Sequence, residues 1–314
     1  MMQVRIQGLT KTFGDLTAVD SLDLTLGDGE IWGFIGPNGA GKTTTLRMLA
    51  TVEQPTDGDA WLGEHSVVRH AEKVRPLIGF MPDYYGSYPD LLVSEYLDFF
   101  ARSYGFYGRE RRRQIDEVVN FTEITPLLDK RVTELSKGMR QRISLGRTLL
   151  HDPQFLLLDE PAAGLDPQAR RDLRELLKLL ADARKTVLIS SHILAELEGL
   201  VDKVAIIQKG RLVYQGDPSG RREDGEEMTV NMRVLGDLQA SLRCALETPG
   251  VINARALDPD IIEVRMDGGP DEIGTLVRRL VEVDQTPYSV VTEEKLLEDV
   301  FLEMTGGGPS AEKH

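Results

Sequence analysis

The sequence predicts an α/β domain with a largely parallel, buried sheet, followed by a smaller α+β domain. Apolar runs at residues 31–35, 155–158 and 187–190 each lead through a turn into a helical pattern, which is typical of buried parallel strands. Beyond a polar, glycine-broken segment at 218–227, the patterns follow the order β-α-β-β-α-β. With 314 residues, 41% of them hydrophobic, the chain is long enough for two domains.

The N-terminal region reads as short strands. Residues 4–26 alternate between apolar and polar side chains and are broken by glycines, which predicts antiparallel strands packed ahead of the first apolar run. Further short strands are predicted at 60–62 and 77–81, and a helix at 44–50.

The turn between the first apolar run and the following helix has the spacing of a phosphate-binding loop. Gly36, Gly41, Lys42 and Thr43 satisfy the pattern G-x-x-x-x-G-K-[ST] in the strand-loop-helix context that the motif requires. Because these glycines and Gly39 carry no side chain, backbone N–H groups can close on phosphate oxygens, which the positive end of the helix also favours. Lys42 would place its charge on the terminal phosphates, and the Thr43 hydroxyl would coordinate Mg²⁺.

Aromatic side chains mark two places. Phe13 could stack on the base of a nucleotide held by the loop, with Val19 adding apolar contact, but a core position is an equally open alternative. Residues 84–107 contain six of the eight tyrosines and three of the nine phenylalanines. We interpret this segment as the core of a small helical subdomain, with an amphipathic docking surface as the alternative. The charged run 109–113 is interpreted as a solvated helix face.

Polar residues follow at the ends of the later elements. Ser136 has the position of an N-cap, so the turn at 135–138 would open a helix and present backbone N–H groups to an anion. Asp159 and Glu160 end a buried strand, where neighbouring side chains point opposite ways and can take different tasks: one holds the Mg²⁺ shell and the other orients water. His192 ends a parallel strand and is expected near the phosphate. A helix at 193–201 and a hairpin at 204–214 would complete the domain.

The C-terminal region predicts a ferredoxin-like sandwich. Strands are expected at 228–234, 251–256, 261–266 and 289–292, and helices at 238–245 and 273–280, with a closing helix at 297–304. No catalytic constellation is visible in this region.

Charge and composition argue against nucleic-acid-binding, membrane-spanning and secreted proteins. The formal charge is −14, from 37 basic and 51 acidic residues, and residues 221–314 alone hold 10 basic against 20 acidic. Such a chain has no broad basic surface, which argues against a nucleic-acid partner. Cys244 is the single cysteine, and no apolar run approaches the roughly 20 residues of a membrane span or forms a secretory signal. We therefore expect a cytoplasmic protein.

Taken in order, these segments resemble the ATP-binding-cassette (ABC) ATPases over residues 2–217, with four separate motifs in the right sequence. The resemblance implies a P-loop NTPase (RecA-like) core with an N-terminal antiparallel β subdomain and a helical subdomain inserted at about 84–150. The nucleotide-binding domain would span 1–217. A linker at 218–227, a small domain at 228–305 and a disordered tail at 306–314 would follow.

The resemblance also implies a role for each motif. Asp159 matches the Walker B carboxylate, Glu160 the catalytic base and His192 the switch histidine, and Lys42 joins them in catalysis. Residues 163–166 match a dimer-contact loop, and 135–139 match the signature turn that caps the γ-phosphate held by an opposing subunit. The residues expected to bind ATP are Phe13, Val19, Gly36, Asn38, Gly39, Ala40, Gly41, Lys42, Thr43, Thr44, Ser136 and Gly138; those expected to bind Mg²⁺ are Thr43, Asp83 and Asp159.

Two motifs depart from the family's pattern. Asp83 stands where the family usually has a glutamine that contacts Mg²⁺; its carboxylate is an equally hard ligand, but shorter and negatively charged. In the signature, Lys137 and Met139 replace the third and fifth residues of L-S-G-G-Q, while Ser136 and Gly138 are kept. Closure of a dimer over ATP is expected to survive, with Lys137 adding attraction to the triphosphate.

The resemblance implies partners as well. Each site would combine the loop of one subunit with the signature of another, so we expect a homodimer or pseudo-dimer. The linker, small domain and closing helix resemble those of bacterial drug, lipid or polysaccharide exporters. We therefore expect an ATPase subunit that drives a separate integral membrane permease from the inner face of the membrane, with residues after Asp83 as its docking groove. Alternatives are an importer ATPase, a soluble non-transport cassette protein and a regulatory module with weak turnover.

Overall fold

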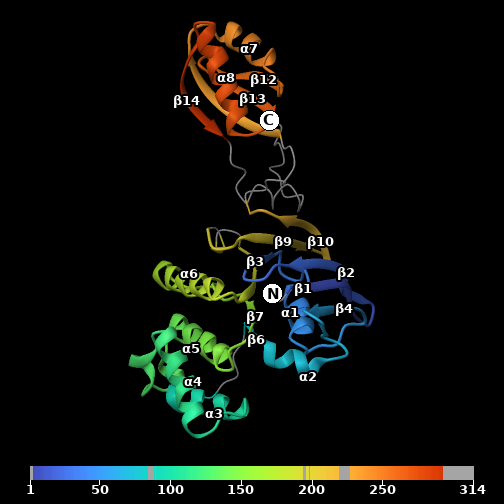
Figure 1. The fold of residues 1–314 in the computed structure, drawn as a ribbon, viewed down its shortest axis with the longest axis vertical. Helices are drawn as coiled ribbons and strands as arrows, with labels where there is room; N and C mark the ends of the chain where they lie inside the picture. The colour runs from blue at the N-terminus through green and yellow to red at the C-terminus, as the bar shows by residue number, and fades with distance from the viewer. Residues whose placement is uncertain are drawn as a thin grey trace, which may run out of the picture. The chain divides into compact units, whose positions relative to one another are not determined.

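The computed structural model describes residues 3–83, 88, 90–193, 196–197, 199–218 and 227–292. These residues form two compact units, one that ends at Pro218 and one within 227–292 (Figure 1). Among the residues described, no helix combines the length and the apolar character needed to cross a bilayer.

A six-stranded sheet in the order β10-β9-β3-β8-β7-β6 forms the centre of the first unit. Strands β6 (Ile78–Met81), β7 (Phe155–Asp159), β8 (Thr186–Ser191), β3 (Ile31–Ile35) and β9 (Lys203–Gln208) are parallel, and β10 (Arg211–Gly216) is antiparallel at one edge. Every residue of β3, β7 and β8 is buried. This confirms the parallel strands and the closing hairpin expected from the sequence, since continuous apolar runs suit strands covered on both faces.

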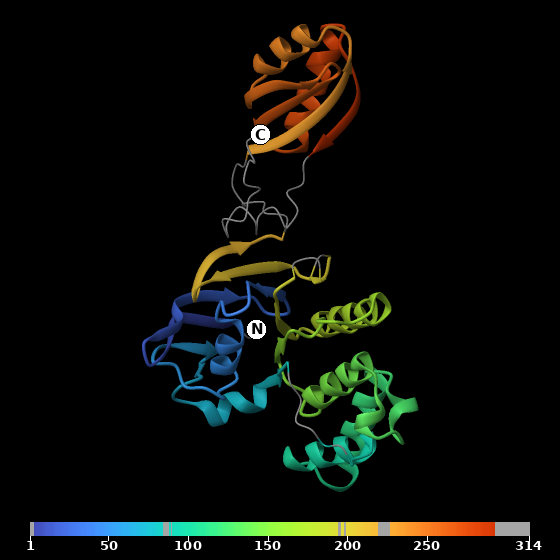
Figure 2. The same cartoon turned by 180° about the vertical axis from the view of Figure 1, so that it is seen from behind.

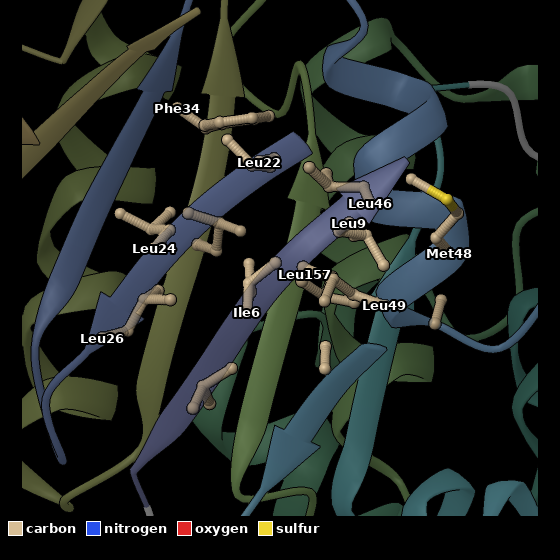
Figure 3. Close-up of a cluster of buried hydrophobic side chains, with 14 of the residues drawn as sticks. Ile6, Leu9, Leu22, Leu24, Leu26, Phe34, Leu46, Met48, Leu49 and Leu157 are labelled. Carbon is tan, nitrogen blue, oxygen red and sulfur yellow. The ribbon is translucent and has the colours of Figure 1, made fainter. Parts of the chain in front are cut away.

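A second, antiparallel sheet has the order β2-β1-β4-β5, with β1 at Val4–Phe13, β2 at Leu16–Leu26, β4 at Asp57–Leu62 and β5 at His65–Ser66. Figure 3 shows its inner face: side chains of β1 and β2 point toward Leu46 and Leu49 of α1 (Lys42–Leu49) and toward Leu157 of β7. The two sheets therefore share one core, with α1 between them.

The first unit also carries the helices of the middle of the chain. They are α2 (Ala71–Val74), α3 (Val93–Ser103), α4 (Gly108–Phe121), α5 (Lys137–Leu149) and α6 (Pro167–Asp182), with short 3₁₀ turns at Arg75–Leu77, Thr125–Leu127 and Val132–Glu134. Helices α3, α4 and α5 lie together at one end of the unit, as both views show (Figures 1 and 2).

The aromatic segment supplies both buried and exposed rings to this helical group. Tyr96 is buried and contacts Phe100 with ring centroids 4.8 Å apart, whereas Phe99 and Tyr107 are exposed. Tyr84 and Tyr85 lie outside the described residues, as do parts of the helix predicted at 193–201.

The second unit has the expected β-α-β-β-α-β order. It comprises β11 (Glu227–Leu235), α7 (Leu238–Leu246), β12 (Val251–Asp258), β13 (Ile261–Asp267), α8 (Pro270–Glu282) and β14 (Thr286–Thr292). The antiparallel sheet has the order β12-β13-β11-β14, and alternate residues of β11 and β13 are buried with Leu276 and Leu280 of α8. The helix predicted at 297–304 and the tail lie outside the described residues.

Candidate active site

The glycine-rich loop lies between β3 and α1 and requires glycine at two positions. A Cβ atom on Gly36 would lie 2.3 Å from the Ile207 carbonyl oxygen, and one on Gly41 would lie 2.4 Å from the Ala18 oxygen. Gly41 also has φ 107°, which disfavours residues with side chains. The first turn of α1 contains no acidic residue, so the helix presents its N–H groups and positive end without internal competition.

Lys42 lies at the start of α1 with only 6% of its surface exposed. Its ammonium group donates hydrogen bonds to the carbonyl oxygens of Gly36 (2.7 Å) and Pro37 (3.3 Å), and it lies 3.5 Å from Glu160 Oε1. The loop thus holds a buried cation close to the carboxylate that directly follows β7, a strand separated from β3 by β8 in the sheet. A ligand with terminal phosphates would offer this cation a stronger partner.

Asp159 is buried at the end of β7. Ser190 of β8 donates a hydrogen bond to its Oδ1 at 2.6 Å, while Oδ2 has no hydrogen-bond partner among the described residues. Burial raises the pKa of the Asp159 carboxyl, as do the negative charges of Glu160 and Asp83, against the lowering effect of the hydrogen bond from Ser190. An unpartnered buried carboxylate oxygen beside a threonine hydroxyl is a donor set that suits Mg²⁺.

Glu160 follows in a left-handed backbone conformation (φ 50°), which is unusual for a residue with a side chain. The backbone N–H of Glu160 donates a hydrogen bond to Ser190 Oγ at 2.9 Å. The Glu160 carboxylate lies between Lys42 and His192, with Oε2 2.8 Å from His192 Nδ1. The turn therefore separates the two acidic side chains: Asp159 points into a closed, polar corner, and Glu160 reaches the open cleft.

The cleft beside the loop has a volume of about 540 Å³. It contains most of the residues that the sequence predicts for nucleotide, metal and catalysis, so residues far apart in the chain meet there. Its lining consists of Phe13, Leu16, Ala18, Asn38, Gly39, Gly41, Lys42, Thr43, Thr44, Asp83, Glu160, Ala163 and His192.

Some residues occupy positions that the sequence did not indicate. Val19 is fully buried, near enough that a Cβ on Gly41 would lie 3.2 Å from its Cγ2, and it is not among the described residues that line the cleft. Leu16 and Ala18 of the same strand line the cleft instead. The alternation along residues 16–19 was the available signal, because Val19 is the apolar residue that faces the core.

Ser136 and Gly138 lie at the start of α5, outside this cleft. Ser136 caps the helix by accepting the Met139 N–H at 3.3 Å. The turn packs on the loop that follows Glu160: a Cβ on Gly164 would lie 2.8 Å from Lys137 Nζ, and Gln141 donates a hydrogen bond to the Pro161 carbonyl. The turn thus packs on a loop that reaches the cleft through Ala163, while Ser136 and Gly138 themselves are not among the described residues that line it.

Comparison with known proteins gives three kinds of similarity. Residues 19–163 match the family model described as ABC transporter. The chain is 35% identical to the Nod factor export ATP-binding protein I of Ralstonia nicotianae over 96% of this chain and 93% of that protein, and 30% identical to the daunorubicin resistance ATP-binding protein DrrA3 of Streptomyces coeruleorubidus over 96% of both.

Solved structures agree in fold. The structure of an ATP-binding subunit of an ABC transporter aligns with a TM-score of 0.61 and 26% identity, covering 68% of this chain and 89% of that one. A dimeric ATP-binding cassette in a post-hydrolysis state, bound to ADP and Pi, aligns with a TM-score of 0.62 and 24% identity, covering 68% of this chain and 98% of that one.

Proposed function

The chain belongs to the ATP-binding proteins of the ABC transporter family, and we propose that it binds and hydrolyses Mg-ATP in the cleft beside α1 and powers an exporter. The observation that carries the proposal is the meeting of Lys42, Thr43, Glu160 and His192 in one cleft. They supply a phosphate-binding cation, a metal ligand, a general base and a polar group beside that base.

The chemistry follows from the positions of these groups. Backbone N–H groups of the loop and the Lys42 ammonium bind the phosphates, and Thr43, Asp159 and Asp83 are the candidates to hold Mg²⁺, which would offset charge on the phosphate oxygens. Glu160 accepts the proton of the attacking water, and His192, 2.8 Å from its carboxylate, orients that carboxylate. Most of the catalysis is then positioning and charge neutralisation.

A second copy of the chain, or a close relative of it, completes the site. Ser136 and Gly138 present a capped helix start outside the chain's own cleft, where they could meet the nucleotide of another subunit. A two-fold arrangement would satisfy both sites at once. The related cassette bound to ADP and Pi is itself a dimer.

The partner that we propose is an integral membrane permease, because relatives aligned over nearly their whole length are named for export and for drug resistance. The exposed rings of Phe99 and Tyr107 in and after α3 offer it an amphipathic contact surface. The ATPase would then act at the inner face of the membrane.

The test of hydrolysis is a comparison of Glu160→Gln with Glu175→Gln, which removes an exposed carboxylate on α6. Glu160→Gln should retain ATP binding and lose at least about 100-fold in turnover, as expected for a general base. Glu175→Gln should keep the wild-type rate. Unimpaired turnover in Glu160→Gln would exclude Glu160 as the base.

The test of the partner is affinity capture of the tagged chain from detergent-solubilised membranes of its own host. A co-purifying protein with several apolar helices, which stimulates or regulates the ATPase when reconstituted, is the expected result. Recovery of ribosomes or DNA instead would favour a non-transport role.

A further inference from the structure

Lys11 lies against the ring that is the candidate contact for the nucleotide base. Its ammonium nitrogen is 4.8 Å from the centroid of the Phe13 ring. The Phe13 ring lines the cleft and is 47% exposed, whereas Lys11 is not among the described residues of the lining and its side chain is only 13% exposed. The ammonium therefore covers the ring from outside the cleft, and a cation at this distance is attracted by the π-system.

Two further contacts fix the ammonium. It forms an ion pair with Glu53 Oε1 at 2.6 Å and donates a hydrogen bond to the Gln54 carbonyl at 2.7 Å. The ion pair and hydrogen bond lower the pKa of the Glu53 carboxyl, which is therefore charged at neutral pH. Contacts with Glu53, Gln54 and the Phe13 ring leave this lysine little freedom, in contrast to the usual surface lysine.

Glu53 and Gln54, which hold the Lys11 ammonium, belong to the segment that directly follows α1. The Val52 and Glu53 N–H groups both donate to the Arg47 carbonyl at the end of that helix. Bonds from Thr56 N–H to Thr10 O (2.8 Å) and from Thr12 N–H to Thr56 Oγ1 (3.0 Å) fasten the same segment to β1. Lys11 thus connects the base-contacting ring to the helix whose other end begins the phosphate site.

The local backbone contributes to this arrangement. The pairing of β1 with β2 shifts register on both sides of Lys11. Such irregularities redirect side chains near functional sites. A half-exposed ring at the end of a strand would otherwise sample several rotamers, and ordering it would reduce the affinity for a base.

We propose that Lys11 is a positioning residue that holds the Phe13 ring ready to stack on the purine base of the nucleotide. The proposal rests on the proposed function, since it presupposes that ATP binds in this cleft. Lys11 contributes to base recognition and leaves the phosphate contacts of Lys42 unchanged. The expected effect of losing its charge is about a three- to tenfold weaker affinity for ATP.

A double-mutant cycle with Phe13 tests the proposal in the intact chain. ATP affinity is measured by calorimetry for the wild type, Lys11→Met, Phe13→Ala and the double variant. Methionine keeps the aliphatic packing but removes the charge, so Lys11→Met should weaken ATP binding about three- to tenfold in the wild-type background and have no effect once Phe13 is alanine. Equal losses in both backgrounds would overturn the proposal.

A ligand that has phosphates but no base shows whether Lys11 positions the Phe13 ring or attracts the phosphates directly. Inorganic tripolyphosphate should bind Lys11→Met as well as it binds the wild type, whereas a parallel loss for tripolyphosphate and ATP would assign Lys11 to the phosphates and overturn the proposal. Lys11→Arg, which keeps both the charge and the ring contact, should restore ATP affinity.

A matched control comes from another lysine on an aromatic ring. Lys203 lies 5.7 Å from the centroid of the Trp32 ring and 3.2 Å from Glu30, and neither Lys203 nor Trp32 lines the cleft among the described residues. Lys203→Met should leave ATP affinity unchanged. If the wild-type chain itself failed to bind ATP, the proposed function would fail; wild-type binding with an unaffected Lys11→Met would refute the Lys11 proposal alone.

Discussion

Asp83 is the residue whose chemistry differs most from the family's pattern. Its side chain lines the same cleft as Thr43 and Glu160, and its charge is one cause of the raised pKa of Asp159. A third carboxylate beside a triphosphate is tolerable only with a cation between them, so Asp83 fits a metal ligand better than a phosphate contact.

Asp83→Asn should therefore raise the Mg²⁺ concentration for half-maximal ATPase activity by about tenfold, since the neutral amide binds the cation more weakly. The measurement is a magnesium titration at fixed ATP. Asp90→Asn, which changes a highly exposed aspartate, is the control. An unchanged or lower magnesium requirement in Asp83→Asn would exclude Asp83 as a ligand.

The buried carboxyl group of Asp159 is expected to destabilise the magnesium-free fold while it serves as a ligand for Mg²⁺. Its pKa in the folded chain lies above the ordinary 3.8, so the unfolded chain releases this proton at lower pH than the folded one. The stability that the protonated carboxyl contributes is lost as pH rises from the unfolded to the folded pKa, and at neutral pH the buried charge is destabilising.

Asp159→Asn removes that charge but keeps an acceptor for Ser190, so it should raise the free energy of unfolding of the magnesium-free protein by about 1–3 kcal/mol. The same change should abolish the additional stabilisation by Mg-ATP. Thermal unfolding in a chelator and in Mg-ATP measures both effects. A less stable apo variant that still responds to Mg-ATP would contradict this account of Asp159.

The sequence predicts those parts of the site that are formed by residues close together along the chain. The spacing of Gly36, Gly41 and Lys42 predicts a loop because each residue acts through its own backbone or charge. Leu16 and Ala18 could not be foreseen, because they reach the cleft only after β2 folds over the loop. Lys11 and Phe13 share a face of β1 by the two-residue period of a strand, but the contacts of Lys11 with Glu53 and Gln54 depend on how the chain folds back beside β1.

At the scale of the element, β6 shows how a sheet edge is closed. As an edge strand it leaves alternate carbonyl groups without a ladder partner. His151 Nε2 lies 2.8 Å from the Ile78 oxygen, and Arg147 donates to the Phe80 oxygen at 3.3 Å. Arg147, in the last turn of α5, lies over the ring of Phe100 in α3. His151, just after α5, stacks on Tyr104, the residue that directly follows α3.

His151 makes this contact dependent on pH. Burial lowers its pKa below the usual 6.5, so the unfolded chain takes up this proton first as pH falls, and stability is lost below about pH 6.5. Between pH 7.5 and 5.5 the wild type should lose up to about 1.4 kcal/mol more of its unfolding free energy than His151→Gln. Denaturant unfolding at the two pH values measures this difference, and equal pH dependence would refute it.

Strong hydrophobic periodicity predicts that a helix or strand is present, but it predicts the first and last residues of that element less accurately. The helix expected at 44–50 begins at Lys42, directly after Gly41, whose left-handed backbone conformation forms its N-cap. The last strand was expected at 289–292 but begins at Thr286 and includes Pro287. Proline is tolerated there because β14 is an edge strand, a fact that only the sheet order reveals.

At the scale of the whole molecule, the two units have separate hydrophobic cores. Calorimetry should therefore resolve two unfolding transitions, of which Mg-ATP raises only the one that belongs to the nucleotide-binding unit. At 100 times the dissociation constant the ligand would stabilise that unit by about 2.7 kcal/mol. A single transition, or an equal shift of both, would show that the units unfold together.

Two chains are expected to close around nucleotide, because the signature turn lies outside the cleft that its own chain forms. Light scattering after size-exclusion chromatography of Glu160→Gln, with and without Mg-ATP, tests this most directly. Glu160→Gln should be a monomer without nucleotide and a dimer with Mg-ATP, and it should be a monomer in both conditions when Lys42→Ala is added. A Glu160→Gln protein that binds Mg-ATP and remains monomeric would contradict it.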